Sequence, residues 1–130
     1  MKAEKALLDA YGDWHRLAEA EGKAIRLHDW NFLLECQKVI QRLQPQITEL
    51  TRAAREEWKQ AGADLAAQEK KFNAVVSELI AMGECNKSLL QAAREAAKSE
   101  REQLEQASQN LKRLQHSYAA GRPTAWSSFS

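Results

Sequence analysis

The chain has 130 residues, with 19 basic and 18 acidic side chains and a net charge of +1 at neutral pH. This balance provides no field that would draw it onto nucleic acid or an anionic membrane. Ala, Leu, Glu, Lys, Gln and Arg dominate, as in long helices and coiled coils, and one all-α domain over residues 1-118 is expected. The sequence contains no apolar stretch of about 18 residues, so it predicts no membrane-spanning helix.

The first predicted helix spans residues 2-27. Its packing positions alternate in spacing between three and four, the period of an amphipathic helix. These positions are Leu7, Tyr11, Trp14, Ala18, Glu21 and Ile25. Gly12 and Gly22 should each weaken this helix by about 1 kcal/mol relative to alanine. Acidic residues near the N-terminus interrupt the apolar run that a signal peptide would need, so we expect a cytoplasmic protein.

The second predicted helix, residues 30-61, follows a very short connection. Asp29 can cap it by accepting a backbone N–H bond, and so short a connection predicts an antiparallel hairpin with the first helix. Its inward positions are Leu33, Cys36, Ile40, Leu43, Ile47, Leu50, Ala54 and Trp58. Pro45 removes one backbone hydrogen bond. Because the apolar register continues in phase across Pro45, we predict a kink and not a break.

The third predicted helix, residues 64-118, is the longest. Gly62 is expected to end the second helix and Asp64 to cap the third. A residue able to pack recurs at every third or fourth position, which is the heptad signature of a helix that packs along a partner helix. This long seam consists of Phe72, Val76, Leu79, Gly83, Asn86, Leu90, Ala93, Ala97, Glu100, Leu104, Ala107, Leu111, Leu114 and Tyr118. At 1.5 Å per residue the helix is about 80 Å long, so two shorter helices should cover only one part of the seam.

The middle of the long seam is less apolar than its ends. Gly83, Asn86 and Glu100 all occupy seam positions there. Polar residues in such a seam can fix the register between helices, or the region can be weakly packed and rearrange to accept a partner helix. For Asn86 we prefer the interpretation that it fixes the register between helices. For Glu100 both interpretations, register and weak packing, stay open. Glycine at position 83 lowers helix propensity and can mark a hinge or a close helix crossing, and the continuity of the helix there is left open.

The four tryptophans have different predicted roles. Trp14 and Trp58 lie at inward positions and are expected in the core, while Trp30 follows the cap residue and can staple the hairpin turn. Residues 119-130 are predicted to be a flexible tail without a fold of its own. Trp126 in that tail is either a docking anchor, since tryptophan is common in binding hot spots, or simply tolerated.

No catalytic or metal-binding motif is recognisable in the sequence. The three histidines are isolated, the glycines are scattered singly, and His15 with Glu19 reads as a helix-surface pair. We therefore expect no enzyme activity, no cofactor and no metal. Cys36 and Cys85 lie far apart without CxxC spacing, which favours two reduced thiols over a disulfide between neighbouring helices.

Two stretches of the chain resemble flagellar export chaperones of the FlgN type. The predicted hairpin matches that family at Glu19, Glu21, Asp29, Leu33, Lys38 and Leu43. The later stretch matches it at Asn86, Leu89 and Leu90 and in the Tyr-x-x-Gly sequence that begins at Tyr118. The segment DWNFLL is similar as well to the sister chaperone family that serves the filament cap protein.

The resemblance implies a cytosolic helical protein that holds hook-associated, filament-junction proteins and delivers them to the export gate. Its client surface would lie in the C-terminal helical region and tail, with Tyr118 as the candidate for gate contact. The implied partner-binding residues are Leu104, Ala107, Leu111, Leu114, Tyr118, Trp126 and Phe129. Two alternatives stay open: a structural coiled coil whose seam is covered by homo-oligomerisation, and a regulatory protein that sequesters a partner helix.

Overall fold

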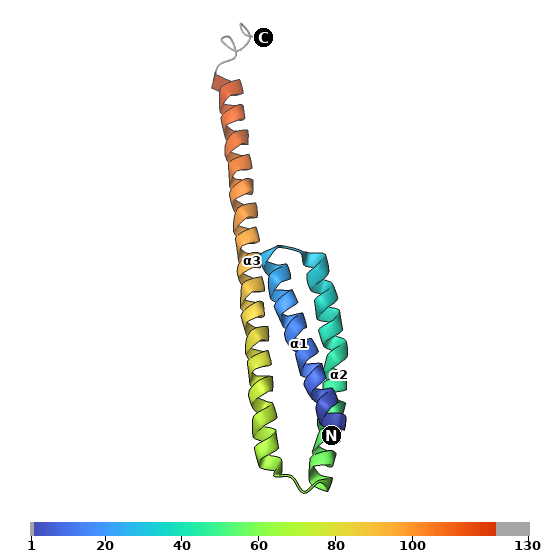
Figure 1. Ribbon diagram of the computed structural model, residues 1–130. Coiled ribbons are helices and arrows are strands. Elements are labelled where there is room, and N and C mark those ends of the chain that lie inside the picture. The colour runs from blue at the N-terminus through green and yellow to red at the C-terminus, as the bar shows by residue number, and fades with distance from the viewer. Residues whose placement is uncertain (1, 122–130) are drawn as a thin grey trace. The chain divides into compact units, whose positions relative to one another are not determined.

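The computed structural model describes residues 2-121, and the side chains of residues 2-117. It contains three helices, α1 (Lys2–Arg26), α2 (Trp30–Gln60) and α3 (Leu65–Gly121), as Figure 1 shows. The prediction of an all-α protein with a helical hairpin and a long third helix is confirmed, and α3 extends past the predicted end at residue 118. The chain divides into two units, Met1–Gln91 and Ala92–Ser130.

The turn between α1 and α2 is built from backbone hydrogen bonds. His28 adopts a left-handed conformation with φ 56°, and the next N–H, that of Asp29, donates to the carbonyl of Ala24 at 2.9 Å. This pattern satisfies carbonyl groups at the end of a helix. The Asp29 carboxylate then accepts a bond from the N–H of Phe32 at 3.2 Å, which confirms it as the cap of α2. Trp30 stacks on His28 with ring centroids 5.3 Å apart.

The second turn uses glycine in the corresponding place. Gly62 has φ +70°, and the N–H of Ala63 donates to the carbonyl of Trp58 at 2.9 Å, so α2 ends as predicted. The Asp64 carboxylate accepts a bond from the N–H of Ala67 at 3.3 Å and caps α3.

Pro45 and Gly83 do not interrupt the helices that contain them. Helix α2 continues through Pro45, so the prediction that the helix does not break is confirmed; the kink stays a prediction. Helix α3 continues through Gly83, and a Cβ atom built there meets nothing within 4 Å. Helix α3 is thus unbroken at Gly83, and the absence of any neighbouring atom within 4 Å of the added Cβ argues against a close helix crossing there; the hinge stays a prediction.

All three helices contribute to the core of residues 2-91. Aromatic rings from each helix meet, since the ring of Phe72 lies 6.1 Å from that of Tyr11 and 5.0 Å from that of Trp58. The main buried cluster comprises Leu7, Tyr11, Ala54, Trp58, Phe72 and Leu79, with Trp14 packed at its margin. A second cluster comprises Ala24, Ile25 and Leu33, with Leu89 and Leu90 against it. Trp58 is thus a core residue as predicted, and Trp14 is partly buried.

Asn86 makes the polar contact that sets α3 against α1. Its side chain is only 8 % exposed, and its amide nitrogen donates to the carbonyl of Ala18 at 2.8 Å and to the carboxylate of Glu21 at 3.0 Å. A Cβ atom at Gly22 would lie 2.7 Å from the Asn86 amide oxygen, so only glycine permits this approach. The predicted register role of Asn86 is confirmed, and we call this arrangement the Gly22–Asn86 contact.

None of the helices within residues 2-121 combines the length and the apolar character needed to cross a membrane.

Candidate functional site

The long seam changes from buried to exposed along α3. Phe72, Leu79 and Asn86 are buried, Leu90 and Ala93 are half-buried, and every seam residue described from Ala97 onward is exposed. The largest of these are Leu104, Leu111 and Leu114, with exposed fractions of 70 %, 56 % and 59 %. Large apolar side chains exposed in a row on one helix are typical of a protein-binding surface.

We define the C-terminal face by the four described side chains Leu104, Ala107, Leu111 and Leu114. Their spacings of three, four and three place them on one stripe of α3, at alternating core positions of a heptad. From the first to the last they span about 15 Å at 1.5 Å per residue. Tyr118 is the next position in this register and belongs to α3, but its side chain lies outside the described residues. Trp126 and Phe129 lie outside the described residues altogether.

The C-terminal face is bordered by uncharged polar side chains. The flanking heptad positions are occupied by Gln103, Ser108, Asn110, Gln115 and Ser117, all of them exposed. Charged residues in this stretch occupy the opposite side of the helix, at Glu105, Lys112 and Arg113. Flanking charges normally select partners in coiled coils, whereas here the apolar side chains are flanked by neutral hydrogen-bonding groups.

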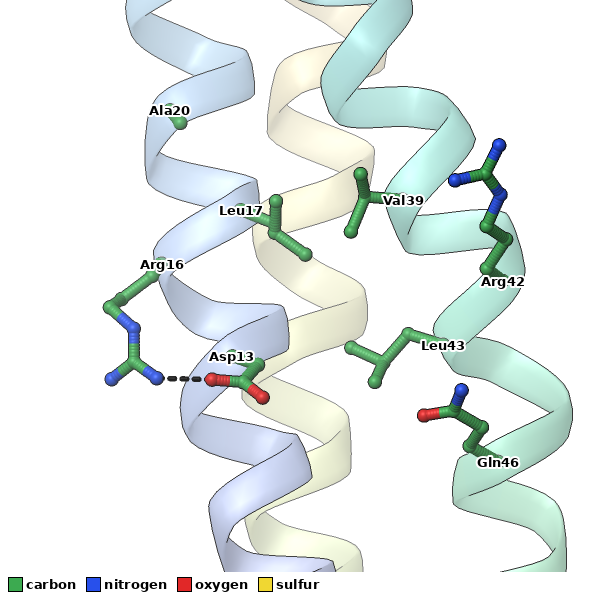
Figure 2. Close-up of a pocket in the computed structure, with 8 residues that line it drawn as sticks. All are labelled: Asp13, Arg16, Leu17, Ala20, Val39, Arg42, Leu43 and Gln46. Atoms are coloured by element: carbon green, nitrogen blue, oxygen red, sulfur yellow. Dashed lines mark hydrogen bonds and ion pairs between the residues drawn. The ribbon is translucent and has the colours of Figure 1, made fainter.

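A groove between α1 and α2 forms a second candidate surface. Figure 2 shows Leu17, Val39 and Leu43 pointing toward one another across it, and its volume is about 590 Å³. Arg16 and Arg42 lie at its two rims, and Arg16 pairs with Asp13. The sequence placed Leu43 inward but did not predict the groove, because the groove depends on the separation of the two helices.

A larger groove lies on another side of the same unit. Its volume is about 900 Å³, and α1, α2 and α3 all contribute to it. Tyr11 and Ile47 lie among apolar residues there, while Thr51 and Arg55 add polar groups. Arg55 is also paired with Glu69 at 3.1 Å, so its charge is already partnered.

The described residues offer little that could support covalent or metal chemistry. Within residues 2-121, no three His, Cys, Asp or Glu side chains come together in a group that could hold a metal ion. His15 pairs with Glu19 at 3.2 Å, as predicted for a helix-surface contact. Cys36 is buried and Cys85 exposed, and both are free thiols. Burial, followed by the nearby Glu21 carboxylate, raises the pKa of Cys36, which keeps this thiol in its unreactive protonated form.

Taken together, the fold is an all-α helical bundle, and exposed leucines lie along one face of its third helix. Comparison of the chain with protein-family models, curated proteins and solved structures found no match.

Proposed function

We propose that this chain is a protein-binding module, a chaperone or adaptor, that accepts an amphipathic helix of a partner on its C-terminal face. The observation that carries the proposal is the exposure of Leu104, Leu111 and Leu114 at heptad spacing on one continuous helix. A partner helix with its own apolar stripe would pack against these side chains, a common mode of peptide recognition.

The size of the face limits how tight such binding can be. Burying a leucine fully contributes about 1.5 to 3 kcal/mol, and these three are a little over half exposed, so together they offer about 3 to 6 kcal/mol. Association costs at least about 4 kcal/mol in lost freedom of motion. A useful affinity therefore needs contacts beyond the three leucines, and Tyr118, Trp126 and Phe129 are the aromatic residues that follow along the chain.

The more specific form of the proposal is a cytoplasmic export chaperone for flagellar hook-associated, filament-junction proteins. Its support is the resemblance at the hairpin positions and at Asn86, Leu89 and Leu90. In that role the C-terminal face would hold the client, and Tyr118 would contact the export gate. No cofactor and no chemical step are part of this function.

Two other functions would use the same face. A structural coiled coil would cover it permanently with further copies of the chain, and a regulatory protein would use it to sequester a partner helix. Permanent oligomerisation predicts a tight complex that is insensitive to salt. A chaperone must instead leave its face available to a client.

A truncation tests the proposal. A chain that ends at Gln103 lacks the whole C-terminal face but keeps the core clusters of residues 2-91. We expect it to retain helical circular dichroism and cooperative unfolding while losing binding to purified hook-associated proteins. Undiminished binding by this truncation would show that the client docks elsewhere, and the groove between α1 and α2 would then be the next surface to test.

A further inference from the structure

The spacing of the C-terminal face is the same in both chain directions, as in any such stretch of a heptad, so two copies can meet antiparallel with matched layers. Leu104 and Leu114 are equally far in sequence from Gln109, and so are Ala107 and Leu111. When two such helices lie antiparallel and cross at Gln109, Leu104 of each copy meets Leu114 of the other. The small Ala107 likewise meets the large Leu111, so each layer combines volumes that fill the space between the helices.

We propose that two copies of this chain pair antiparallel along residues 100-118 when no other partner is bound. A parallel pair in register is disfavoured, because Ala107 would face Ala107 and leave a gap. Glu100 would also face Glu100 and bring two carboxylates together in the seam. The antiparallel register places Glu100 at the level of position 118 of the other copy, which removes this repulsion.

The charges around the face agree with the antiparallel register. Flanking positions of the same kind meet in an antiparallel pair, so Ser108 meets Ser108 and Asn110 meets Asn110, and no like charges are forced together. Outside them, Glu105 of one copy comes within one residue of the level of Lys112 of the other, and the two-fold axis repeats this opposite-charge relation. All four side chains are exposed.

The pair is expected to be reversible. Residues 100-118 span about 27 Å at 1.5 Å per residue, and so short a helix pair falls below the roughly 1,600 Å² buried in a standard stable interface. The second copy would therefore cover the leucines when no client is present and give way to a client with a longer apolar stripe. The pairing itself does not depend on the identity of that client.

Sedimentation equilibrium of the full chain tests the pairing first. We expect the apparent mass to rise from 14.7 kDa toward twice that value as concentration increases. Leu111→Gln should reduce this association at least about 10-fold. Leu34→Gln, at a similarly exposed leucine on α2 (54 % exposed), should leave it unchanged. A mass that stays monomeric up to about 1 mM, or equal effects of the two variants, would overturn the proposal.

Disulfide trapping then fixes the orientation. In a Cys85→Ser background, chains carrying Leu104→Cys should form disulfides with chains carrying Leu114→Cys, and neither should form them alone. A Cα separation beyond about 7 Å prevents such a bond, so the assay is sensitive to register. Disulfides within each single variant would indicate a parallel pair and contradict the inference. Neither assay contains a hook-associated protein, so the outcomes of the two assays are independent of the proposed function.

Discussion

Alanine at Gly22 should destabilise the protein, although alanine favours a helix. The change gains about 1 kcal/mol in helix propensity. However, the new Cβ would lie 2.7 Å from the Asn86 amide oxygen, closer than real Cβ contacts allow. Asn86 must then move, and its bonds to Ala18 at 2.8 Å and to the Glu21 carboxylate at 3.0 Å are strained or lost.

The expected magnitude follows from these two bonds. A neutral hydrogen bond contributes about 1 kcal/mol net and one to a charged group about 1.5 to 3 kcal/mol, so their loss costs about 2.5 to 4 kcal/mol. After the propensity gain, Gly22→Ala should lower the free energy of unfolding by about 1.5 to 3 kcal/mol. In an Asn86→Ala background the obstacle is gone, and the same change should raise stability by up to about 1 kcal/mol.

Urea unfolding followed by circular dichroism measures all four members of this double-mutant cycle. Gly83→Ala is the matched control, because no atom lies within 4 Å of its added Cβ, and it should stabilise by about 1 kcal/mol. The reasoning is refuted when Gly22→Ala stabilises the original chain as much as Gly83→Ala does, or when its effect keeps the same sign in the Asn86→Ala background.

Three further outcomes can be measured in the same way. Leu79→Ala should lower the free energy of unfolding by about 2 to 5 kcal/mol because Leu79 is buried. Leu114→Ala, on the same seam, should lower it by less than about 0.5 kcal/mol. Equal losses in the two variants would contradict the burial pattern. Asp29→Ala removes the cap bond of α2 and should cost about 0.5 to 2 kcal/mol in urea unfolding, so an unchanged midpoint would argue against the cap. Burial raises the pKa of the Cys36 thiol and that of the Tyr11 hydroxyl above their ordinary values. The folded chain therefore retains protons that the unfolded chain releases, and a pH series of urea unfolding should show stability level below these values and falling as the pH rises past them. Constant stability across that range would contradict the burial of both groups.

Local chemistry explains why so much of the fold could be predicted. The caps at Asp29 and Asp64 and the end of α2 at Gly62 each depend on a few neighbouring residues. A heptad spacing also identifies a seam without any knowledge of what covers it. Each of these features depends on residues within one or two helical turns, so it can be predicted from the sequence alone.

Contacts between distant segments could not be predicted in the same way. Sequence reasoning treated Gly22 only as a weak point of α1, because its role depends on Asn86, which is far away in the chain. It named Gly83 as the position of a hinge or of a close helix crossing, and Gly83 is exposed within the continuous helix α3. The grooves between helices were not predicted for the same reason, because the separation of two helices depends on contacts between distant segments.

The exposed leucines could be recognised only in part. The length of the seam predicted that the shorter helices would leave one region of α3 uncovered. The described seam residues from Ala97 onward are exposed, which identifies that region. Which molecule packs against it depends on surfaces outside this chain. The uncharged border of the C-terminal face narrows the choice to partners that need no flanking ion pairs.

The central claim is that the C-terminal face binds a client helix, and calorimetric titration with a purified hook-associated protein tests it most directly. The variant Leu104→Gln/Leu111→Gln/Leu114→Gln should fold normally, because all three side chains are exposed and glutamine favours helices about as well as leucine. We predict that the original chain and the Leu34→Gln control bind the client, and that the triple variant loses at least about 100-fold in affinity. Equal affinity of the triple variant and the original chain would contradict the claim.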